Sequence, residues 1–183
     1  MTIEAGPQEL FTTPALESDA AAIVLLVNSA YRGPGSHRGW TTEADLIGGQ
    51  RTDEEAIREL LRTRDNAILV VRGQKGLNAC AHVSRKSAVT SYLSMLTVRP
   101  ALQGSLLGRH LLAASETFAR REYGARFLEM NVLEQREELI AWYERRGYQA
   151  TGEKRPFPYG DERVGIPSRD DLTFLVLMRE LSG

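Results

Sequence analysis

The chain has 183 residues, of which 42% are hydrophobic and 26% are charged, a composition typical of one globular domain with a hydrophobic core. Its 23 basic and 24 acidic residues nearly cancel, so no overall positive charge is available to attract nucleic acid or an anionic membrane. The sequence has no apolar run of about 18 residues and no basic-then-apolar signal peptide. We therefore expect a cytoplasmic protein that binds neither nucleic acid nor membranes.

The sequence carries no pattern typical of a metal site or a serine-histidine-aspartate triad. Its single cysteine, Cys80, cannot form an internal disulfide and lies in an apolar run, where a buried, unreactive thiol is expected. His37, His82 and His110 are isolated, with no second ligand at metal-binding spacing. We predict no metal site and interpret His82 as a histidine of the core or of a sheet face.

The N-terminal third is predicted to contain an edge strand at residues 10–16 and a helix at residues 18–31, with Ser and Asp at its start. A short helix is expected to begin at Thr41 or Thr42, and another covers residues 53–62. Between the helix at residues 18–31 and the expected short helix lies the segment Arg32–Trp40, which has three glycines and one proline. Its Trp, His and Arg side chains favour a binding loop over a simple connector.

The middle of the chain is predicted to form three neighbouring antiparallel strands, at residues 66–72, 77–85 and 90–98. The first two are joined by a hairpin turn that contains Gly73 and Gly76. The third strand ends just before Pro100 and leads into a loop and a helix.

The strand–loop–helix unit between Tyr92 and Gly124 is the most informative part of the sequence. The loop and the start of the helix contain Gly104 and Gly108, and Gly124 is expected to end the helix. The first turn of a helix has unpaired backbone N–H groups and partial positive charge, so it can bind a phosphate. Glycines in the loop would let the phosphate come close to the backbone. A glycine-rich turn that only caps the helix is the alternative, because neither a P-loop nor a dinucleotide fingerprint is present.

The C-terminal part is predicted to add a strand at residues 126–133, parallel to the preceding one, and a helix at residues 137–146. Strand alternation places Leu128, Met130 and Val132 on one face and Glu129 on the other. Two further strands are expected at residues 148–153 and 172–178, separated by a loop rich in proline, glycine and charge.

Two segments together resemble the GNAT acetyltransferases. Val98-x-Pro100-x-x-Gln103-Gly104-x-x-x-Gly108-Arg109 resembles motif A of that family, whose loop wraps the pyrophosphate of acetyl-coenzyme A, although Leu106 stands where a glycine is usual. Val132-x-x-x-Arg136-x-x-Leu139-x-x-Trp142-Tyr143-x-x-x-Gly147-Tyr148 resembles motif B, with Arg136 and Leu139 in place of the family's asparagine and alanine.

The resemblance implies one domain over residues 9–182, with an α/β fold built on a mixed, splayed sheet of six or seven strands flanked by helices. It implies acetyl-CoA as cofactor. The residues that it places against the cofactor are Leu96, Thr97 and Val98 at the pantetheine, and Gln103, Gly104, Ser105, Leu106, Leu107, Gly108 and Arg109 at the pyrophosphate.

The implied activity is transfer of an acetyl group to a primary amine of a small molecule, peptide or protein, by direct attack in a ternary complex. Tyr143 corresponds to the family's general acid. Glu129 is our candidate for the base, with a structural salt bridge or a water chain as alternatives. Tyr31, Trp40 and Glu43 are expected to enclose the amine acceptor by aromatic contact and charge.

Two other classes of function stay open on the sequence alone. A catalytically silent acyl-CoA-binding or protein-interaction module would keep the loop without needing Tyr143. A nucleotide-binding protein would use the same loop for ATP or GTP. The identity of the acceptor and the choice between monomer and homodimer are left open as well.

Overall fold

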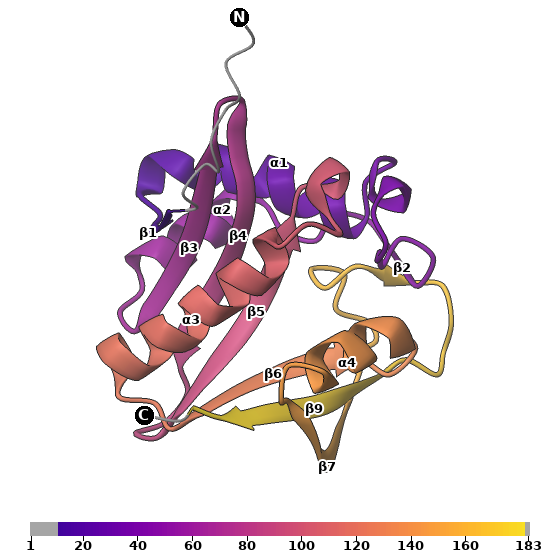
Figure 1. Cartoon of the computed structure of the whole chain (residues 1–183). Coiled ribbons are helices and arrows are strands. Elements are labelled where there is room, and N and C mark those ends of the chain that lie inside the picture. Colours follow the sequence, from indigo (N-terminus) through magenta and orange to yellow (C-terminus); the bar gives the residue numbers. More distant parts are fainter. Residues whose placement is uncertain (1–10, 182–183) are drawn as a thin grey trace, which may run out of the picture.

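A mixed seven-stranded sheet dominates the computed structural model, which describes residues 11–181 (Figure 1). In sheet order its strands are β1 (Thr12–Pro14), β3 (Asn66–Gly73), β4 (Gly76–Arg85), β5 (Thr90–Val98), β6 (Phe127–Leu133), β9 (Thr173–Glu180) and β7 (Gln149–Pro156). The α-helices are α1 (Ala20–Tyr31), α2 (Glu54–Arg62), α3 (Leu107–Tyr123) and α4 (Glu137–Glu144). This arrangement confirms the predicted α/β fold and the expected size of its sheet.

The sheet splits between β5 and β6. These two strands are parallel and pair only where Thr90–Tyr92 lie beside Phe127–Glu129. Beyond Tyr92 they diverge, so that β1, β3, β4 and β5 form one arm of a wedge and β6, β9 and β7 form the other (Figure 1). The separated strands leave room between the arms for a site.

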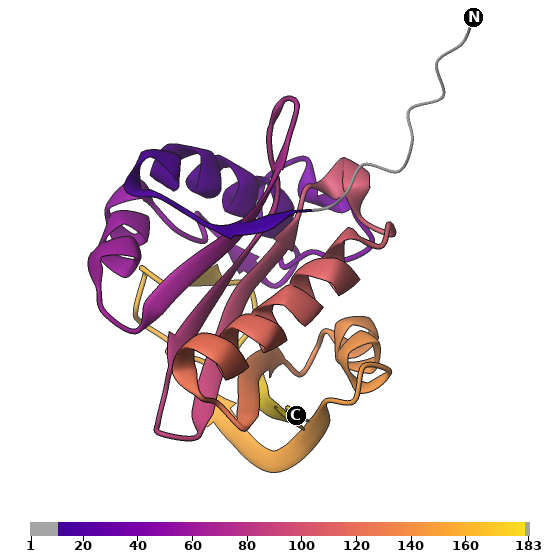
Figure 2. The ribbon, with the colours of Figure 1, turned by 60° about the vertical axis from the view of Figure 1, so that its left-hand side comes forward.

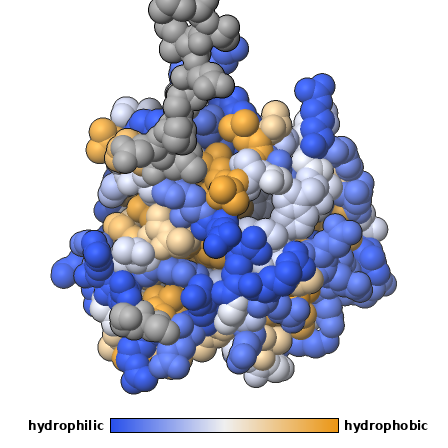
Figure 3. Space-filling view, viewed as in Figure 1, coloured by the Kyte–Doolittle hydropathy of each residue, from blue (hydrophilic) through white to orange (hydrophobic). Residues whose placement is uncertain are grey.

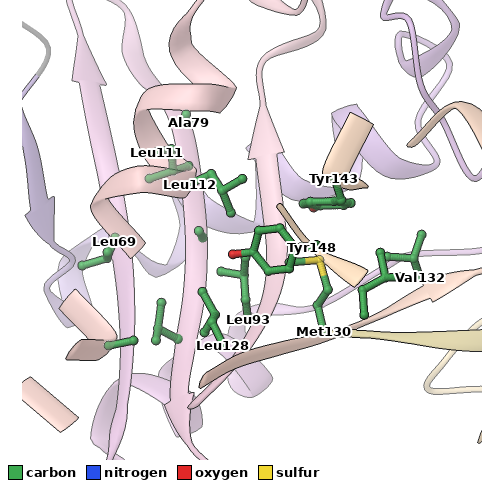
Figure 4. Packing of buried hydrophobic residues seen from close by; sticks show 14 of the residues in the cluster. Leu69, Ala79, Leu93, Leu111, Leu112, Leu128, Met130, Val132, Tyr143 and Tyr148 are labelled. Carbon is green, nitrogen blue, oxygen red and sulfur yellow. The ribbon is translucent and has the colours of Figure 1, made fainter. Parts of the chain in front are cut away.

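The helices cover both faces of the sheet (Figure 2). One core cluster joins α1 and α2 to β3, β4 and β5 through residues such as Ile23, Ile57 and Val70. The other joins α3 and α4 to β3–β6, and Figure 4 shows Leu111 and Leu112 of α3 on one side of it. The helix α3 ends as predicted, because Gly124 adopts φ +65°, in the left-handed region that glycine occupies at least cost.

One predicted element is wrong. The short helix expected from Thr41 or Thr42 is a turn, which leads into the two-residue strand β2 (Ile47–Gly48). This strand pairs with β8 (Ile166–Pro167), so the expected C-terminal loop contains a strand as well. Tertiary contacts override the local helix signal here, because the backbone N–H of Glu43 donates to Tyr31 O at 2.9 Å and its side chain pairs with arginines.

Smaller differences concern element ends. Three 3₁₀ turns were not predicted: η1 (Glu17–Asp19) precedes α1, η2 (Ser36–Arg38) lies in the loop after α1, and η3 (Pro100–Leu102) follows β5. The strand β7 continues three residues beyond the predicted end at Glu153. The expected domain limits at residues 9 and 182, and the first residue of the expected edge strand, lie outside the described residues.

Candidate active site

The loop between β5 and α3 leaves the start of α3 open to a ligand. The N-cap residue Leu106 makes no side-chain capping hydrogen bond, and the first turn contains no acidic residue. Gly104 adopts φ +81°, and no atom lies within 4 Å of the position that a Cβ would occupy. The N–H groups and partial positive charge of this turn therefore favour an anion.

A cavity of about 400 Å³ lies against this loop, and we call it the loop cavity. It is lined by Leu96, Val98, Gln103, Gly104, Ser105, Leu106, Gly108 and Arg109, with Trp40, Thr41, Leu139, Trp142, Arg145 and Arg146 opposite. Eight of the ten residues expected at the cofactor thus come together. The other two, Thr97 and Leu107, are buried with 2% and 5% of their surface exposed and do not line the cavity. Figure 3 shows a hollow on this side of the molecule, with a hydrophobic patch beside it and hydrophilic residues below.

Three arginines line the loop cavity without a carboxylate among its lining residues: Arg109, Arg145 and Arg146. Partial burial lowers the pKa of Arg146, and repulsion from Arg145 and Arg109 lowers it further. Its guanidinium carbon lies 3.7 Å from the centre of the Trp142 ring. Like charges gathered at the mouth of a cavity destabilise one another until an anion binds there.

Two buried polar atoms at this cavity have no hydrogen-bond partner among the described residues. Gln103 Nε2 donates to Val98 O at 3.2 Å, but Gln103 Oε1 has no donor. Arg146 Nη1 donates to Trp142 O at 2.6 Å, but Arg146 Nε is unpaired. Buried polar groups are normally satisfied, so these atoms indicate that the cavity receives a polar ligand.

A β-bulge in β5 changes which of its residues face each side of the sheet. Cys80 and His82 of β4 pair with Thr97 and Ser94, so Met95 and Leu96 lie opposite one β4 residue. Met95 has φ +50°, an uncommon value outside glycine. Met95 joins the core cluster under α1 and α2, whereas Leu96 packs against the cluster under α3 and α4. The two bulge residues therefore contact opposite faces of the sheet, close to the point where β5 and β6 separate.

A second cavity, of about 270 Å³, lies on the α1 side of the bulge, and we call it the arginine cavity. Its lining includes Tyr92, Ser94 and Met95 of β5 and residues 131–133 of β6. It also includes four arginines and a single carboxylate, namely Arg32, Arg51, Arg136, Arg163 and Glu43. Leu139 of α4 lines both cavities, so the two meet in the wedge between β5 and β6.

Tyr31 and Glu43, both predicted to contact the acceptor, line the arginine cavity. The Glu43 carboxylate is held by two arginines, Arg32 Nη2 at 3.2 Å and Arg136 Nη1 at 3.0 Å. Burial, helped by the negative charge of Glu43, raises the pKa of Tyr31 to about 12, so its phenol stays protonated near neutral pH. The Tyr31 hydroxyl donates to Leu96 O at 3.5 Å and thereby reaches the bulge.

Trp40, the third predicted acceptor residue, lies at the other cavity. It lines the loop cavity, where its ring centre is 6.4 Å from that of Trp142. It is absent from the lining of the arginine cavity. Its place in the structure therefore favours contact with the cofactor over contact with the acceptor.

Tyr143 lies in the core of the wedge, on α4 (Figure 4). Its ring packs edge-on against Trp142 and Tyr148, with ring centres 5.0 and 5.6 Å away. Burial raises the pKa of its phenol, and the neighbouring Tyr31 raises it further. Among the described residues the phenol makes no hydrogen bond, and Tyr143 lines neither the loop cavity nor the arginine cavity.

Glu129, the predicted base, is buried at 3% exposure and doubly ion-paired. Lys86 Nζ donates to its two carboxylate oxygens at 2.6 and 2.7 Å, and Arg155 Nη1 donates at 2.9 Å. It lines neither cavity. Of the alternatives that the sequence left open, this geometry favours a structural salt bridge.

Sequence reasoning missed five arginines of the site: Arg51, Arg136, Arg145, Arg146 and Arg163. Arg136 was visible only as the residue that replaces the motif B asparagine. Arg145 and Arg146 come just after α4, next to the glycine that ends motif B, and this basic pair was the available signal. Nothing local marks Arg51, because its role depends on the long-range packing of α1 against β5.

The comparisons with known proteins agree with this geometry. The sequence profile of the acetyltransferase (GNAT) domain matches residues 43–157. The chain therefore belongs to the GNAT acetyltransferase family, and it is an acetyl-CoA-dependent N-acetyltransferase. None of the curated protein sequences compared with the chain matches it.

Several solved structures share the fold. One is yncA of Salmonella typhimurium, described as an acetyltransferase and solved with its cofactor acetyl-CoA; it is 22% identical, covers 96% of each chain and superposes with a TM-score of 0.69. Another is the ribosomal-protein-alanine N-acetyltransferase of Brucella melitensis, 21% identical over 94% of this chain and 100% of the other, with a TM-score of 0.68. Nourseothricin acetyltransferase is 20% identical over 94% and 99%, with a TM-score of 0.66.

The part of the chain from residue 11 to residue 181 contains no helix long and apolar enough to cross a membrane. Within the same range, no group of three or more His, Cys, Asp or Glu side chains is arranged to hold a metal ion.

The loop cavity fits acetyl-CoA on the structural evidence. The open first turn of α3 and the three arginines suit phosphate groups. The unpaired atoms of Gln103 and Arg146 suit polar groups elsewhere on the same molecule. Leu96, Val98 and Trp142 supply an apolar wall that leads from the loop to the bulge.

Proposed function

We propose that this protein transfers the acetyl group of acetyl-CoA to a primary amine by direct attack of the amine in a ternary complex. The observation that carries the proposal is the arrangement of the two cavities, which share Leu139 and are lined by neighbouring residues of the β5 bulge, Leu96 in one and Met95 in the other. An acetyl donor in the loop cavity and an amine in the arginine cavity can be bound together, which direct attack requires.

The residues of the loop cavity would hold the cofactor. The first-turn N–H groups of α3, with Arg109, Arg145 and Arg146, would bind its phosphates. The main chain of Leu96–Val98 would hold its pantetheine arm beside the bulge. When bound, acetyl-CoA supplies an acetyl thioester.

The reaction needs two proton transfers, one from the attacking amine and one to the departing thiolate. A primary alkyl amine has a pKa of roughly 10, so it must lose a proton before it can attack. Because Glu129 is bound by Lys86 and Arg155, we assign this proton to water in the arginine cavity rather than to the carboxylate directly. Tyr143 then donates a proton to the departing thiolate, a role that its protonated phenol without a hydrogen-bond partner suits.

The main competing functions make different demands on the structure. A silent acyl-CoA-binding module would need the loop cavity but no second cavity opening at the bulge. A nucleotide-binding protein would prefer ATP or GTP to coenzyme A. Binding of acetyl-CoA, coenzyme A, ATP and GTP, followed by release of free thiol from acetyl-CoA with mixed primary amines, distinguishes the three.

Replacement of Gly108 by glutamate tests the loop cavity. A Cβ at this position would meet Val98 and Trp142 at 3.5 and 3.7 Å, which is ordinary contact, so Gly108→Glu should fold. Its carboxylate would repel the phosphates at the start of α3. We expect the dissociation constant of acetyl-CoA, measured by calorimetry, to rise roughly tenfold or more, a change of about 1.4 kcal/mol.

The control is Thr117→Glu, which adds the same charge to an exposed position of α3, outside the loop cavity. It should leave acetyl-CoA affinity nearly unchanged. Equal affinities for wild type and Gly108→Glu would remove the phosphate site from this loop. Tight binding of acetyl-CoA with no thiol release for any amine would favour the silent module.

A further inference from the structure

The charge of the arginine cavity constrains what it can bind. The sequence suggested that Glu43 selects a cationic acceptor, but its carboxylate is already shared between Arg32 and Arg136. The side chains of Arg32 and Glu43 are only 3% and 10% exposed, so this is a buried, compensated group. Four arginines against one carboxylate leave the lining with a net charge of 4 − 1 = +3.

Arg51 is the arginine of this cavity for which the described residues offer no ion pair, whereas Arg32 and Arg136 pair with Glu43. Arg163 pairs with Asp161 at 2.7 Å, outside the cavity lining. Among residues 11–181, Arg51 has no acidic side chain within ion-pair distance. Its guanidinium carbon instead lies 5.6 Å from the centre of the Tyr31 ring.

Arg51 is half-buried and lines the arginine cavity together with Tyr31 of α1 and Tyr92 of β5. Burial lowers the pKa of His82 on β4, and the positive charge of Arg51 lowers it further. Burial raises the pKa of Tyr31 on α1 and Tyr92 on β5, and the charge of Arg51 offsets part of that rise. The surrounding polar side chains, Ser94 and Asn131, are neutral, and burial keeps His82 neutral too. A cation in such a place lacks a counter-ion, and a bound anion would supply one.

The geometry points to an acceptor that carries a carboxylate or a similar oxyanion near its amine, bound by the guanidinium of Arg51. This inference rests on the proposed function and names the acceptor class for the same site. Arginine suits the task because its planar guanidinium donates two parallel hydrogen bonds to a carboxylate. A volume of about 270 Å³ suits a molecule of amino-acid size, and the net charge disfavours polyamines.

The test compares matched pairs of acceptors with the wild-type enzyme and acetyl-CoA. Each pair is a free L-amino acid and its carboxamide, with aminoalkylphosphonates against plain alkylamines as a second anion class and spermidine as the cationic extreme. We expect kcat/KM to favour the anionic member of the best pair by at least about tenfold. A preference for amides, alkylamines or spermidine would overturn the inference while leaving the acetyltransferase assignment intact.

Arg51→Gln removes the guanidinium, and Arg58→Gln is the matched control. Arg58 is half-exposed on α2, pairs with Glu54 four residues earlier and lines neither cavity. We expect the acid-over-amide preference to fall to within about threefold in Arg51→Gln and to persist in Arg58→Gln. The loss should appear in the KM of the acceptor, with the dissociation constant of acetyl-CoA unchanged. A full preference in Arg51→Gln would assign anion binding elsewhere.

A binding measurement covers the case in which no acceptor of the panel turns over. Calorimetry in the presence of coenzyme A compares N-acetyl amino acids with their carboxamides as product analogues. Stronger binding of the acids, lost in Arg51→Gln, supports the inference, and equal or absent binding of both contradicts it. Failure to bind acetyl-CoA at all would instead contradict the proposed function.

Discussion

At the scale of single residues, the protonation of two phenols sets what the site can do. Burial raises the pKa of both Tyr31 and Tyr143, helped by the negative charge of Glu43 at Tyr31 and by Tyr31 at Tyr143. Neither can act as a base near neutral pH, and both can donate a proton. Tyr31 already donates to Leu96 O at 3.5 Å, whereas Tyr143 has no such partner, which is why we assign the acid role to Tyr143.

Tyr143→Phe should therefore lower turnover more than affinity. It removes the proton donor and keeps the ring contacts with Trp142 and Tyr148. General acid catalysis is typically worth about 10²–10⁴-fold, so we expect a loss of kcat in that range with the dissociation constant of acetyl-CoA nearly unchanged. Because burial raises the pKa of Tyr143, the phenol should stay protonated up to about pH 10. Wild-type activity should therefore rise with pH as the amine deprotonates, with no decline at any pH under about 10.

The control for this variant is Tyr148→Phe. The Tyr148 hydroxyl already donates to Glu116 Oε1 at 2.9 Å, so its proton is engaged and its removal should leave kcat nearly intact. If Tyr143→Phe keeps its rate within a factor of two across the pH range, the proton comes from another group. A fall in wild-type activity already between pH 7 and 9 would show that the acid has an ordinary or lowered pKa.

At the scale of elements, the small β2–β8 sheet closes the arginine cavity. Arg32 of the loop after α1 donates to Val164 O at 2.8 Å, and β2 pairs with β8. Gly165 lies at the contact point with φ +113°, and a Cβ there would approach Arg32 Nη1 to 2.2 Å and Gly48 O to 2.8 Å. The segments that flank the cavity can pack together only because this residue has no side chain.

We expect Gly165→Ala to destabilise the fold more than Gly160→Ala. Both glycines have positive φ, +113° and +87°, so both variants strain the backbone by about 1–3 kcal/mol. Only Gly165→Ala also places a methyl group against Arg32 and Gly48, since nothing lies within 4 Å of the Gly160 position. Thermal unfolding should show a lower midpoint for Gly165→Ala, together with a raised KM for the acceptor. Equal midpoints for the two variants would mean that the segments do not meet as described.

At the scale of the whole molecule, local patterns predicted the elements and long-range packing decided the site. The α3 helix, its end at Gly124 and the two motifs were readable because capping, periodicity and glycine placement act within a few residues. The bulge at Met95 was not readable, because it depends on pairing with β4 rather than on β5 alone. Leu93 and Met95 would therefore lie on the same face of a regular strand. In the structure Leu93 belongs to the core cluster under α3 and α4, and Met95 belongs to the cluster under α1 and α2.

The candidate site divides in the same way. Most of the loop-cavity residues between β5 and α3 follow one another in sequence, so one motif was enough to predict them. The arginine cavity is assembled from α1, the loops after it, β5, β6 and the C-terminal loop, which are far apart in the chain. Its charge depends on which carboxylate each arginine meets, and only the folded structure shows that Glu43 is already neutralised.

Global stability should depend on pH through His82. This side chain is 6% exposed and lies between Ser94 and Asn66, each at 2.8 Å from a ring nitrogen. Burial, helped by the charge of Arg51, lowers its pKa to about 4 from 6.5. His82 binds a proton below about pH 6.5 in the unfolded chain but only below about pH 4 in the folded protein. The free energy of unfolding therefore decreases as the pH falls from 6.5 to 4. At pH 5 the loss is about 2 kcal/mol relative to neutral pH, on the basis of about 1.4 kcal/mol for each pH unit.

Urea unfolding of wild type and two variants at pH 7 and pH 5 checks this expectation. His82→Gln cannot titrate, so its free energy of unfolding should change less between the two pH values than that of wild type, by about 2 kcal/mol, whatever its stability at pH 7. His37→Gln replaces a histidine whose side chain is 54% exposed and should keep the wild-type dependence. Buried or ion-paired carboxylates with lowered pKa values, such as Asp19, act below about pH 4 and therefore outside this window. A wild-type pH dependence in His82→Gln would show that His82 is protonated in the fold near its ordinary pKa.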